Sequence, residues 1–191
     1  MSFPERLVVV HGYTASPAKH WFPWLAAEAE QAGAEAVVVP LPDSDHPDVR
    51  AWGDAVAAAA ESLGGASEGL WIVGHSLGAI TALRWVASLS AGSRIGGVVL
   101  VAGTIEPVPT LPALDDYLAA GLSDAEVARI REVAGEIRAI HSDDDATVPP
   151  EFSERMETRL GASTQVVPGA GHFVDREGWT ELPAVLVALS A

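Results

Sequence analysis

The nine residues at positions 70–78, Leu-Trp-Ile-Val-Gly-His-Ser-Leu-Gly, carry more structural information than any other part of the chain. The first four form a short apolar run typical of a buried strand, and the residues after position 78 have the apolar spacing of a helix. A serine between two glycines, at a tight turn from strand to helix, is typical of a nucleophile elbow. We therefore expect Ser76 to act as a nucleophile, with the backbone N–H of Leu77 binding the negative charge that develops on its substrate.

A serine nucleophile needs a base that takes its proton, and the base needs an acid that orients it. Two further apolar runs lead into such side chains. Residues 137–141 precede three aspartates, Asp143–Asp145, and residues 164–167 precede His172. Loops at the carboxyl ends of parallel strands meet at one edge of the sheet, where open α/β sheets build their sites. We expect His172 to be the base and one of the three aspartates to be the acid.

The loop after the first apolar run, residues 11–14, is the expected source of a second N–H for the oxyanion. If the first strand lies beside the third, with the second outside it, this loop faces the serine where strand order reverses. We expect the N–H of Tyr13 to be the donor, with that of Thr14 as the alternative. For His75 a packing or hydrogen-bonding role is favoured, and for Trp21 a place in the core. The candidate pocket residues are His11, Thr14, His20, Trp21 and His75.

Short apolar runs alternate with segments of helical spacing along the whole chain. Ser123 and Glu126 form a capping box, which predicts a helix that continues to about Ala134. This alternation predicts an α/β fold, with a doubly wound, mostly parallel six-stranded sheet and helices on both faces. The runs expected to be strands are Leu7–Val10, Ala36–Val39, Leu70–Val73, Val98–Val101, Ile137–His141 and Thr164–Val167.

The length of 191 residues favours a single domain that comprises residues 1–191. Residues 104–135 form the one long excursion between expected strands, and the start of this excursion is rich in proline. The excursion suggests a loop over the edge of the sheet, followed by one or two helices. It is too short for a separate lid domain, although it could cover a pocket.

Composition excludes several classes of function. Acidic side chains outnumber basic ones by 26 to 11, for a net charge of −15, so neither nucleic acid nor an anionic membrane surface is an expected partner. The absence of cysteine rules out disulfides, thiolate metal sites and a cysteine nucleophile. No apolar run is long enough to span a membrane, and the first residues lack the pattern of a signal peptide, so we expect a cytoplasmic location. A protein partner stays open, because net charge says little about it.

Four motifs together resemble the signature set of the α/β-hydrolase superfamily: His11-Gly12, residues 74–78, Asp145 with Val148-Pro149, and residues 171–173. Within that superfamily, the runs 11–16 and 20–25 resemble the YdeN-like serine hydrolases, a group that includes the retinoblastoma-binding-protein type. The resemblance extends from near residue 7 to near residue 180. It implies a compact hydrolase core without a large cap domain, a Ser-His-Asp triad and activity on small esters. It also favours Asp145 as the acid, with Asp144 as the alternative, because the superfamily carries a carboxylate three residues before a Val-Pro or Leu-Pro pair.

We therefore expect a serine hydrolase of the esterase type, which cleaves a small ester or amide through a Ser76-His172-Asp145 triad and an acyl-enzyme intermediate. No cofactor and no metal are expected. The motif Asp143-x-Asp145-x-Thr147 also occurs in phosphatases that form an aspartyl phosphate, but here it follows the fifth strand and no lysine comes after it. Two alternatives stay open: a non-catalytic protein-interaction role on the same fold, and an acyltransferase that uses the same triad.

Overall fold

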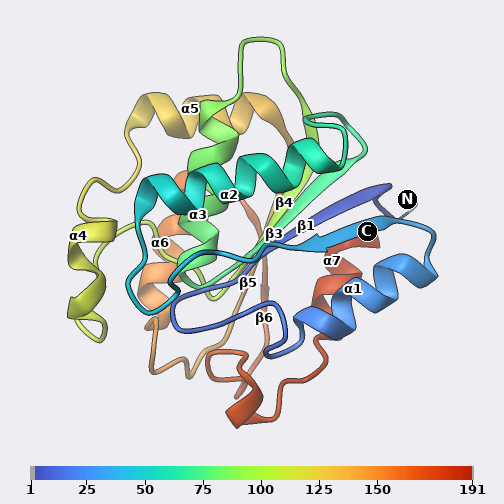
Figure 1. The fold of residues 1–191 in the computed structure, drawn as a ribbon. Coiled ribbons are helices and arrows are strands. Elements are labelled where there is room, and N and C mark those ends of the chain that lie inside the picture. Colours follow the sequence, from blue (N-terminus) through green and yellow to red (C-terminus); the bar gives the residue numbers. More distant parts are fainter. Residues whose placement is uncertain (1–2, 191) are drawn as a thin grey trace.

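Six parallel strands form one sheet in the order β2-β1-β3-β4-β5-β6 in the computed structural model, which describes residues 3–190 (Figure 1). Strand order reverses between β1 and β3, because β2 lies outside β1 while the later strands follow on the side of β3. The expected condition, that the first strand lies beside the third with the second outside it, is therefore met. The strands are β1 (Arg6–Val10), β2 (Glu35–Val38), β3 (Leu70–His75), β4 (Ile95–Val101), β5 (Ala134–His141) and β6 (Ser163–Val166).

Helices connect the strands and cover both faces of the sheet, so the predicted doubly wound architecture is confirmed (Figure 1). Within residues 3–190, no helix has both the length and the apolar character that a membrane crossing requires. The α-helices are α1 (Phe22–Gln31), α2 (Val49–Ser62), α3 (Leu77–Ser88), α4 (Asp115–Leu118), α5 (Asp124–Val133), α6 (Pro150–Leu160) and α7 (Pro183–Ser190), and the short 3₁₀ helices are η1 (Pro112–Leu114) and η2 (Asp175–Glu177).

The sheet separates two hydrophobic cores. Val8 and Val10 of β1 belong to the core that α2, α3, α5 and α6 cover, whereas Leu7 and Val9 belong to the core under α1 and α7. This division follows from the period of two in a strand, which sends successive side chains to opposite faces. Both sides of β1 are apolar because both faces are covered, as is usual for a parallel sheet.

The two edge strands differ from the expectation of strands covered on both faces. All four residues of β6 are exposed, and none of the four residues of β2 is fully buried. Each edge strand has a neighbour on one side only, and both are short, which is a common way of limiting exposed strand edges. The central strands β3 and β4 are longer than predicted, because β3 runs on to His75 and β4 already begins at Ile95.

The excursion between β4 and β5 contains η1, α4 and α5. The capping box at its last helix is confirmed: the Ser123 hydroxyl accepts the N–H of Glu126, and the Glu126 carboxylate accepts the N–H of Ser123. α5 packs against α3, which places this part of the excursion over a helical layer and not at an edge of the sheet. The predicted order of a loop followed by one or two helices is found, since residues 102–111 leave the carboxyl end of β4 as a loop and lead into η1, α4 and α5.

The register of the central strands brings their carboxyl ends to one level. Val10 pairs with Gly74, and His75 pairs with Val101, which in turn pairs with Ile140. The loops that follow β1, β3, β4 and β5 therefore leave the sheet side by side. This edge also includes the reversal of strand order, where open α/β sheets bind their ligands.

Candidate active site

Ser76 lies in the sharp turn between β3 and α3, with a backbone φ of 55° that only a constrained turn imposes on a serine. Two glycines permit the turn. A Cβ at Gly74 would lie 2.7 Å from the Cα of Ala79, and a Cβ at Gly78 would lie 2.2 Å from the carbonyl oxygen of Val10. The Ser76 side chain does not cap α3, so its hydroxyl is available to another partner.

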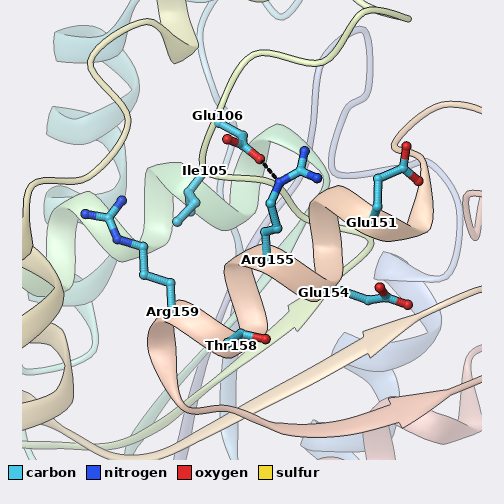
Figure 2. Close-up of a pocket in the computed structure, with 7 residues that line it drawn as sticks. All are labelled: Ile105, Glu106, Glu151, Glu154, Arg155, Thr158 and Arg159. Carbon is cyan, nitrogen blue, oxygen red and sulfur yellow. Dashed lines mark hydrogen bonds and ion pairs between the residues drawn. The ribbon is translucent and has the colours of Figure 1, made fainter.

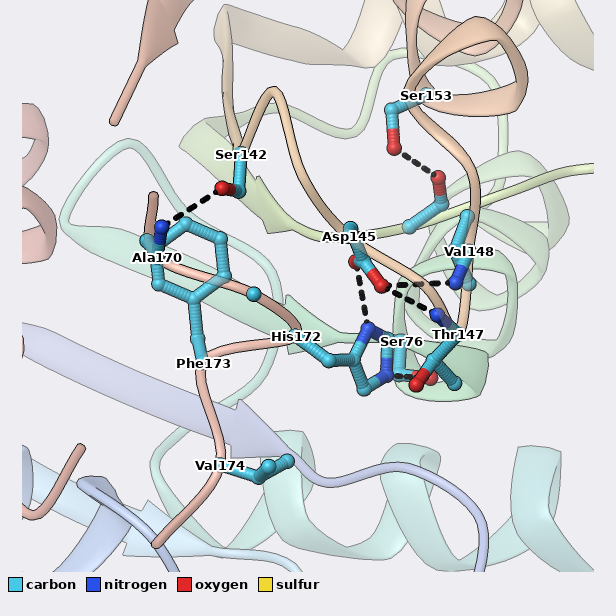
Figure 3. A network of polar contacts seen from close by, with 12 residues as sticks. Ser76, Ser142, Asp145, Thr147, Val148, Ser153, Ala170, His172, Phe173 and Val174 are labelled. Atoms are coloured by element: carbon cyan, nitrogen blue, oxygen red, sulfur yellow. Dashed lines mark hydrogen bonds and ion pairs between the residues drawn. The ribbon is translucent and has the colours of Figure 1, made fainter. Parts of the chain in front are cut away.

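Three side chains from three loops form one hydrogen-bonded line (Figure 3). Oγ of Ser76 lies 2.9 Å from Nε2 of His172, and Nδ1 of His172 lies 2.7 Å from Oδ2 of Asp145. The other carboxylate oxygen of Asp145 accepts the N–H groups of Thr147 and Val148, at 2.8 and 2.9 Å. The exposed fractions are 6% for Ser76, 5% for His172 and 4% for Asp145, so little water competes for these contacts.

Asp144, the alternative acid, does not contact His172 in this way. Its carboxylate accepts the hydroxyl of Ser142 at 2.6 Å and the N–H of Gly171 at 2.8 Å. These two hydrogen bonds lower the pKa of Asp144. Both contacts stabilise the ionised carboxylate. Through the N–H of Gly171, the carboxylate also holds the backbone next to His172 in place.

Four successive N–H groups of the histidine loop are held by side chains, an arrangement that the sequence did not reveal. Asp143 accepts the N–H of Gly169 at 2.8 Å, and Ser142 accepts that of Ala170 at 2.9 Å. Asp144 takes the next N–H, and Glu177 accepts that of His172 at 2.7 Å. The acidic run after β5 thus holds the loop after β6 while it supplies the acid to the imidazole.

Two backbone N–H groups are the candidate donors for an oxyanion at the serine. The N–H of Leu77 belongs to the first residue of α3, where helix geometry offers no intrahelical acceptor and the helix dipole favours negative charge. Tyr13, in the loop after β1, lines the same cavity as Ser76. The N–H of Thr14, the alternative donor, is already used, because it donates to the carbonyl of Ser44 at 2.9 Å. Thr14 is therefore unsuited to the oxyanion role.

His75, the last residue of β3, is buried against the histidine loop. Its Nε2 lies 2.9 Å from the carbonyl oxygen of His172 and must carry a proton, since a carbonyl can only accept. Nδ1 has no hydrogen-bond partner among the described residues. Burial, reinforced by the nearby His172 ring, lowers the pKa of His75 well below its usual value. His75 is thus a neutral side chain that holds the backbone of His172, in line with the hydrogen-bonding role favoured from the sequence.

The other candidate pocket residues divide into two groups. Thr14, His20 and His75 line the cavity above Ser76, whereas His11 and Trp21 do not. The Nδ1 of His11 lies 2.9 Å from the carbonyl oxygen of Gly12, so this ring braces the loop after β1. Burial lowers the pKa of His11, against the effect of that hydrogen bond.

Trp21 lies behind the histidine loop and not in the cavity wall. It is fully buried in the core under α1 and α7, and its Nε1–H donates to the carbonyl of Phe173 at 3.1 Å. His20, beside it, accepts the N–H of Asp175 through Nδ1 at 3.1 Å. Burial lowers the pKa of His20, with Asp175 acting in the opposite direction.

The cavity above Ser76 has a volume of about 430 Å³ and is lined by five separate segments of the chain. The loop after β1 supplies Tyr13 and Thr14, and the excursion between β4 and β5 supplies Thr110 and Leu111. The expectation that this excursion contributes to a pocket is confirmed. Residues that sequence analysis missed are those on distant loops, namely Lys19, Thr110, Leu111, Ala146, Thr147, Val174, Asp175 and Arg176.

A larger cavity, of about 610 Å³, lies along α6 and contains none of the three aligned side chains (Figure 2). Its polar lining residues include Arg155, whose guanidinium pairs with the carboxylate of Glu106 across the cavity. No serine or histidine lines it. Within residues 3–190, moreover, no three His, Asp or Glu side chains are grouped so that they could hold a metal ion. The chemistry is therefore concentrated in the smaller cavity.

A parallel sheet in this strand order, with a serine turn after β3, defines the α/β-hydrolase class. Comparison with known proteins identifies the family. The chain belongs to the serine hydrolase family, which it matches over residues 7–191, and it is a hydrolase.

Individual relatives agree with this assignment. YdeN of Bacillus subtilis (strain 168), described as a hydrolase, is 32% identical over 187 residues, which cover 98% of this chain and 95% of YdeN. The crystal structure of the B. subtilis ydeN gene product matches with a TM-score of 0.89 over 97% of this chain and 96% of that one. A YdeN-like hydrolase from Pectobacterium atrosepticum matches with a TM-score of 0.72 at 18% identity, over 96% and 88% of the two chains. A carboxylesterase structure from Nitrososphaera gargenis gives 0.69 at 12% identity, over 97% and 89%. At these lower identities the similarity concerns the fold alone.

Proposed function

We propose that this protein is an esterase-type serine hydrolase that cleaves a small ester, or a small amide, through a covalent acyl-enzyme. The observation that carries the proposal is the line from Ser76 Oγ to His172 Nε2, at 2.9 Å, and from His172 Nδ1 to Asp145 Oδ2, at 2.7 Å. Both distances lie within the range that proton transfer requires. The three side chains follow one another in the chain as Ser, Asp and His, the order found in α/β-hydrolases.

In the first half of the reaction, Ser76 Oγ attacks the carbonyl carbon of the substrate while His172 Nε2 takes the hydroxyl proton. Asp145 orients the ring and stabilises the imidazolium that forms. The backbone N–H groups of Thr147 and Val148, which its other oxygen accepts, hold the Asp145 carboxylate in place. His172 then gives the proton to the leaving alcohol, and the acyl group stays on Ser76.

The N–H groups of Leu77 and Tyr13 stabilise the oxyanion in this scheme. Removing one donor from such a site typically slows the reaction about 10²- to 10³-fold. In the second half, His172 activates a water that attacks the acyl carbon, and Ser76 Oγ recovers its proton as the acid product leaves. No cofactor takes part.

The structural neighbours support an ester as the substrate. They include the carboxylesterase of N. gargenis and a monoacylglycerol lipase of Paleococcus ferrophilus, whose TM-scores are 0.69 and 0.66. An ester is also the easier substrate for such a site, because its alcohol leaving group needs less protonation by the enzyme than the amine that an amide releases.

Labelling with a fluorophosphonate probe tests the proposal directly. The folded protein should form a covalent adduct, and Ser76→Ala should not be labelled although it keeps the wild-type circular dichroism spectrum. A panel of p-nitrophenyl esters of increasing chain length, run beside arylamides, should show turnover of the shorter esters. Folded wild-type protein that neither reacts with the probe nor hydrolyses any ester would refute the proposal.

A further inference from the structure

The basic side chains of this protein are nearly all engaged with other parts of the chain. Nine of the ten arginines have at least one hydrogen bond or ion pair with a described residue. Arg176 is the exception: within residues 3–190 its guanidinium has no such partner. It lies in η2, four residues after His172, and lines the cavity above Ser76.

Lys19, the only lysine of the chain, lines the same cavity from the opposite end of the sequence. Its Nζ lies 3.9 Å from a carboxylate oxygen of Asp175, and its side chain is 57% exposed. An exposed ion pair of this length is weak, so the ammonium group can accept a second anionic partner at little cost. Both residues thus line the cavity and have N–H donors that could bind an anionic group of a substrate.

The charge of the cavity lining is the reverse of that of the chain. In the whole chain acidic side chains outnumber Lys and Arg by 26 to 11. Among the residues that line the cavity, two are basic, Lys19 and Arg176, and one is acidic, Asp175. Burial lowers the pKa of His20 and of His75, so neither ring adds positive charge at neutral pH.

Hydroxyl groups complete the lining. Thr14, Thr110 and Thr147 line the cavity together with the two cations and the serine. The Thr110 hydroxyl already donates to the carbonyl of Thr147, so it offers an acceptor oxygen and not a free proton. A long alkyl chain that filled the cavity would desolvate these hydroxyl groups and the two cations without replacing their hydrogen bonds.

We propose that the preferred substrate is a small ester with a carboxylate, or a similar anionic oxygen group, remote from the bond that is cleaved. Arg176 and Lys19 bind this group, and a guanidinium can do so through two parallel hydrogen bonds. Only the ester C–O bond changes in the reaction, as in the proposed esterase mechanism on which this inference rests. The anionic group serves to bind and orient the substrate.

Two matched pairs of substrates test the inference. The monomethyl ester of adipic acid and its neutral monoamide place the charge on the acyl side, whereas meta-acetoxybenzoate and meta-acetoxybenzamide place it on the alcohol side. For at least one pair, kcat/KM of the anionic ester should exceed that of the neutral one by about three- to tenfold at low ionic strength. The preference should shrink when salt is raised from about 20 to about 500 mM.

Variants of Arg176 and Lys19 test whether these two residues cause the preference for the anionic ester. Arg176→Gln should bring the anionic-to-neutral ratio of kcat/KM close to one, and Lys19→Gln should lower it. Arg50→Gln removes the same charge from an exposed position on α2 outside this cavity, so the ratio should stay at its wild-type value. All three variants alter exposed side chains, and their circular dichroism spectra should match that of the wild type.

The outcomes distinguish failure of the proposed substrate preference from failure of the proposed esterase function. If fluorophosphonate labels Ser76 and both members of each pair are hydrolysed at equal rates, the substrate inference is wrong and the esterase proposal stands. A preference that survives unchanged in both Gln variants would equally overturn the role of Arg176 and Lys19. If there is neither labelling nor hydrolysis, the proposed function itself fails.

Discussion

At the scale of single residues, the sharpest question is which of two neighbouring aspartates acts in the proposed triad. Asp145→Asn should lower kcat about 10³- to 10⁴-fold, because an amide cannot favour the correct tautomer of His172 or stabilise its cation. Asp144→Asn should lower kcat less than about tenfold, since the amide oxygen can still accept the N–H of Gly171. Steady-state hydrolysis of a p-nitrophenyl ester measures both.

The two substitutions make the same chemical change one position apart, so each is a control for the other. Urea unfolding should confirm that both variants are folded under the conditions of the assay. The opposite order of effects, with Asp144→Asn the inactive variant, would contradict the assignment of Asp145.

The burial of His75 leads to a prediction of how the free energy of unfolding depends on pH. Burial lowers the pKa of His75 in the folded state, whereas the unfolded chain takes up a proton near pH 6.5. The unfolded state then binds more protons, so the stabilisation is complete above about pH 6.5 and is lost as the pH falls below it. The free energy of unfolding should drop by up to about 1.4 kcal/mol per pH unit for this one group.

Urea unfolding between pH 7.5 and pH 5 measures this slope. His11 and His20 act in the same direction, because burial lowers their pKa values too. His75→Gln should therefore reduce the slope without abolishing it, while its amide N–H can still donate to the carbonyl of His172. His46→Gln removes an exposed imidazole and serves as the matched control for the loss of one histidine. A free energy of unfolding that is constant over this range would contradict the prediction.

At the scale of the secondary-structure elements, the close approach of α3 to β1 limits which residues the elbow accepts. A Cβ at Gly78 would lie 2.2 Å from the backbone oxygen of Val10, which cannot move without displacing β1. Gly78→Ala should lower the free energy of unfolding by about 3 kcal/mol or more. Gly53→Ala, inside α2 with no atom within 4 Å of the new Cβ, should raise it by up to about 1 kcal/mol.

Urea unfolding at constant pH compares the two variants, which differ only in where the same methyl group is added. Equal stabilities of the two variants would show that α3 can shift away from β1 and that the elbow is less tightly packed than the structure indicates. Only Gly78→Ala should also lower activity, since Gly78 belongs to the serine turn whereas Gly53 lies in α2 and does not line the cavity above Ser76.

The elements also show which parts of the structure could be read from the sequence. Most strands were predictable because they are short apolar runs, and the three triad candidates were predictable because each follows an expected strand. The edge strand β6 is the exception, because Ser163–Val166 is largely polar and exposed. Two helices were not predicted. α6 opens with Pro149-Pro150 and is largely polar, and its apolar positions, Phe152, Met156 and Leu160, are spaced at four residues and were the signal available. α7 is apolar almost throughout, so it lacks the amphipathic period that identifies a helix.

The cavity lining could not be predicted in the same way. Lys19, Thr110 and Arg176 are far apart in the sequence and lie in connecting segments, including η2, whose course depends on tertiary contacts. The hydrogen bonds from Asp143 and Asp144 to the loop before His172 join segments more than 25 residues apart, and no local pattern marks them. Sequence patterns thus identify the reactive groups, whereas the substrate-binding groups emerge only from the fold.

At the scale of the whole molecule, charge is the dominant feature. Even if every lysine and arginine were paired, 15 acidic side chains would have no basic partner, as the net charge of −15 states. Excess charge of one sign destabilises a compact state through self-repulsion, and salt screens that repulsion over about 10 Å at 0.1 M. The midpoint of thermal unfolding at pH 7.5 should therefore rise by a few degrees when sodium chloride is raised from about 10 to about 300 mM.

The same measurement near the isoelectric point, about pH 4.6, supplies the comparison, because there the net charge is close to zero. The effect of salt should then vanish, although the protein as a whole is less stable at that pH once the unfolded state binds protons at its histidines. A midpoint that falls with salt at pH 7.5 would mean that the ion pairs of Arg129, Arg138 and Arg159 outweigh the repulsion among the unpaired acids. A rise at pH 7.5 that disappears near pH 4.6 would identify the unpaired acids as its cause, and would leave the two cations of the cavity as a local reversal in an otherwise acidic molecule.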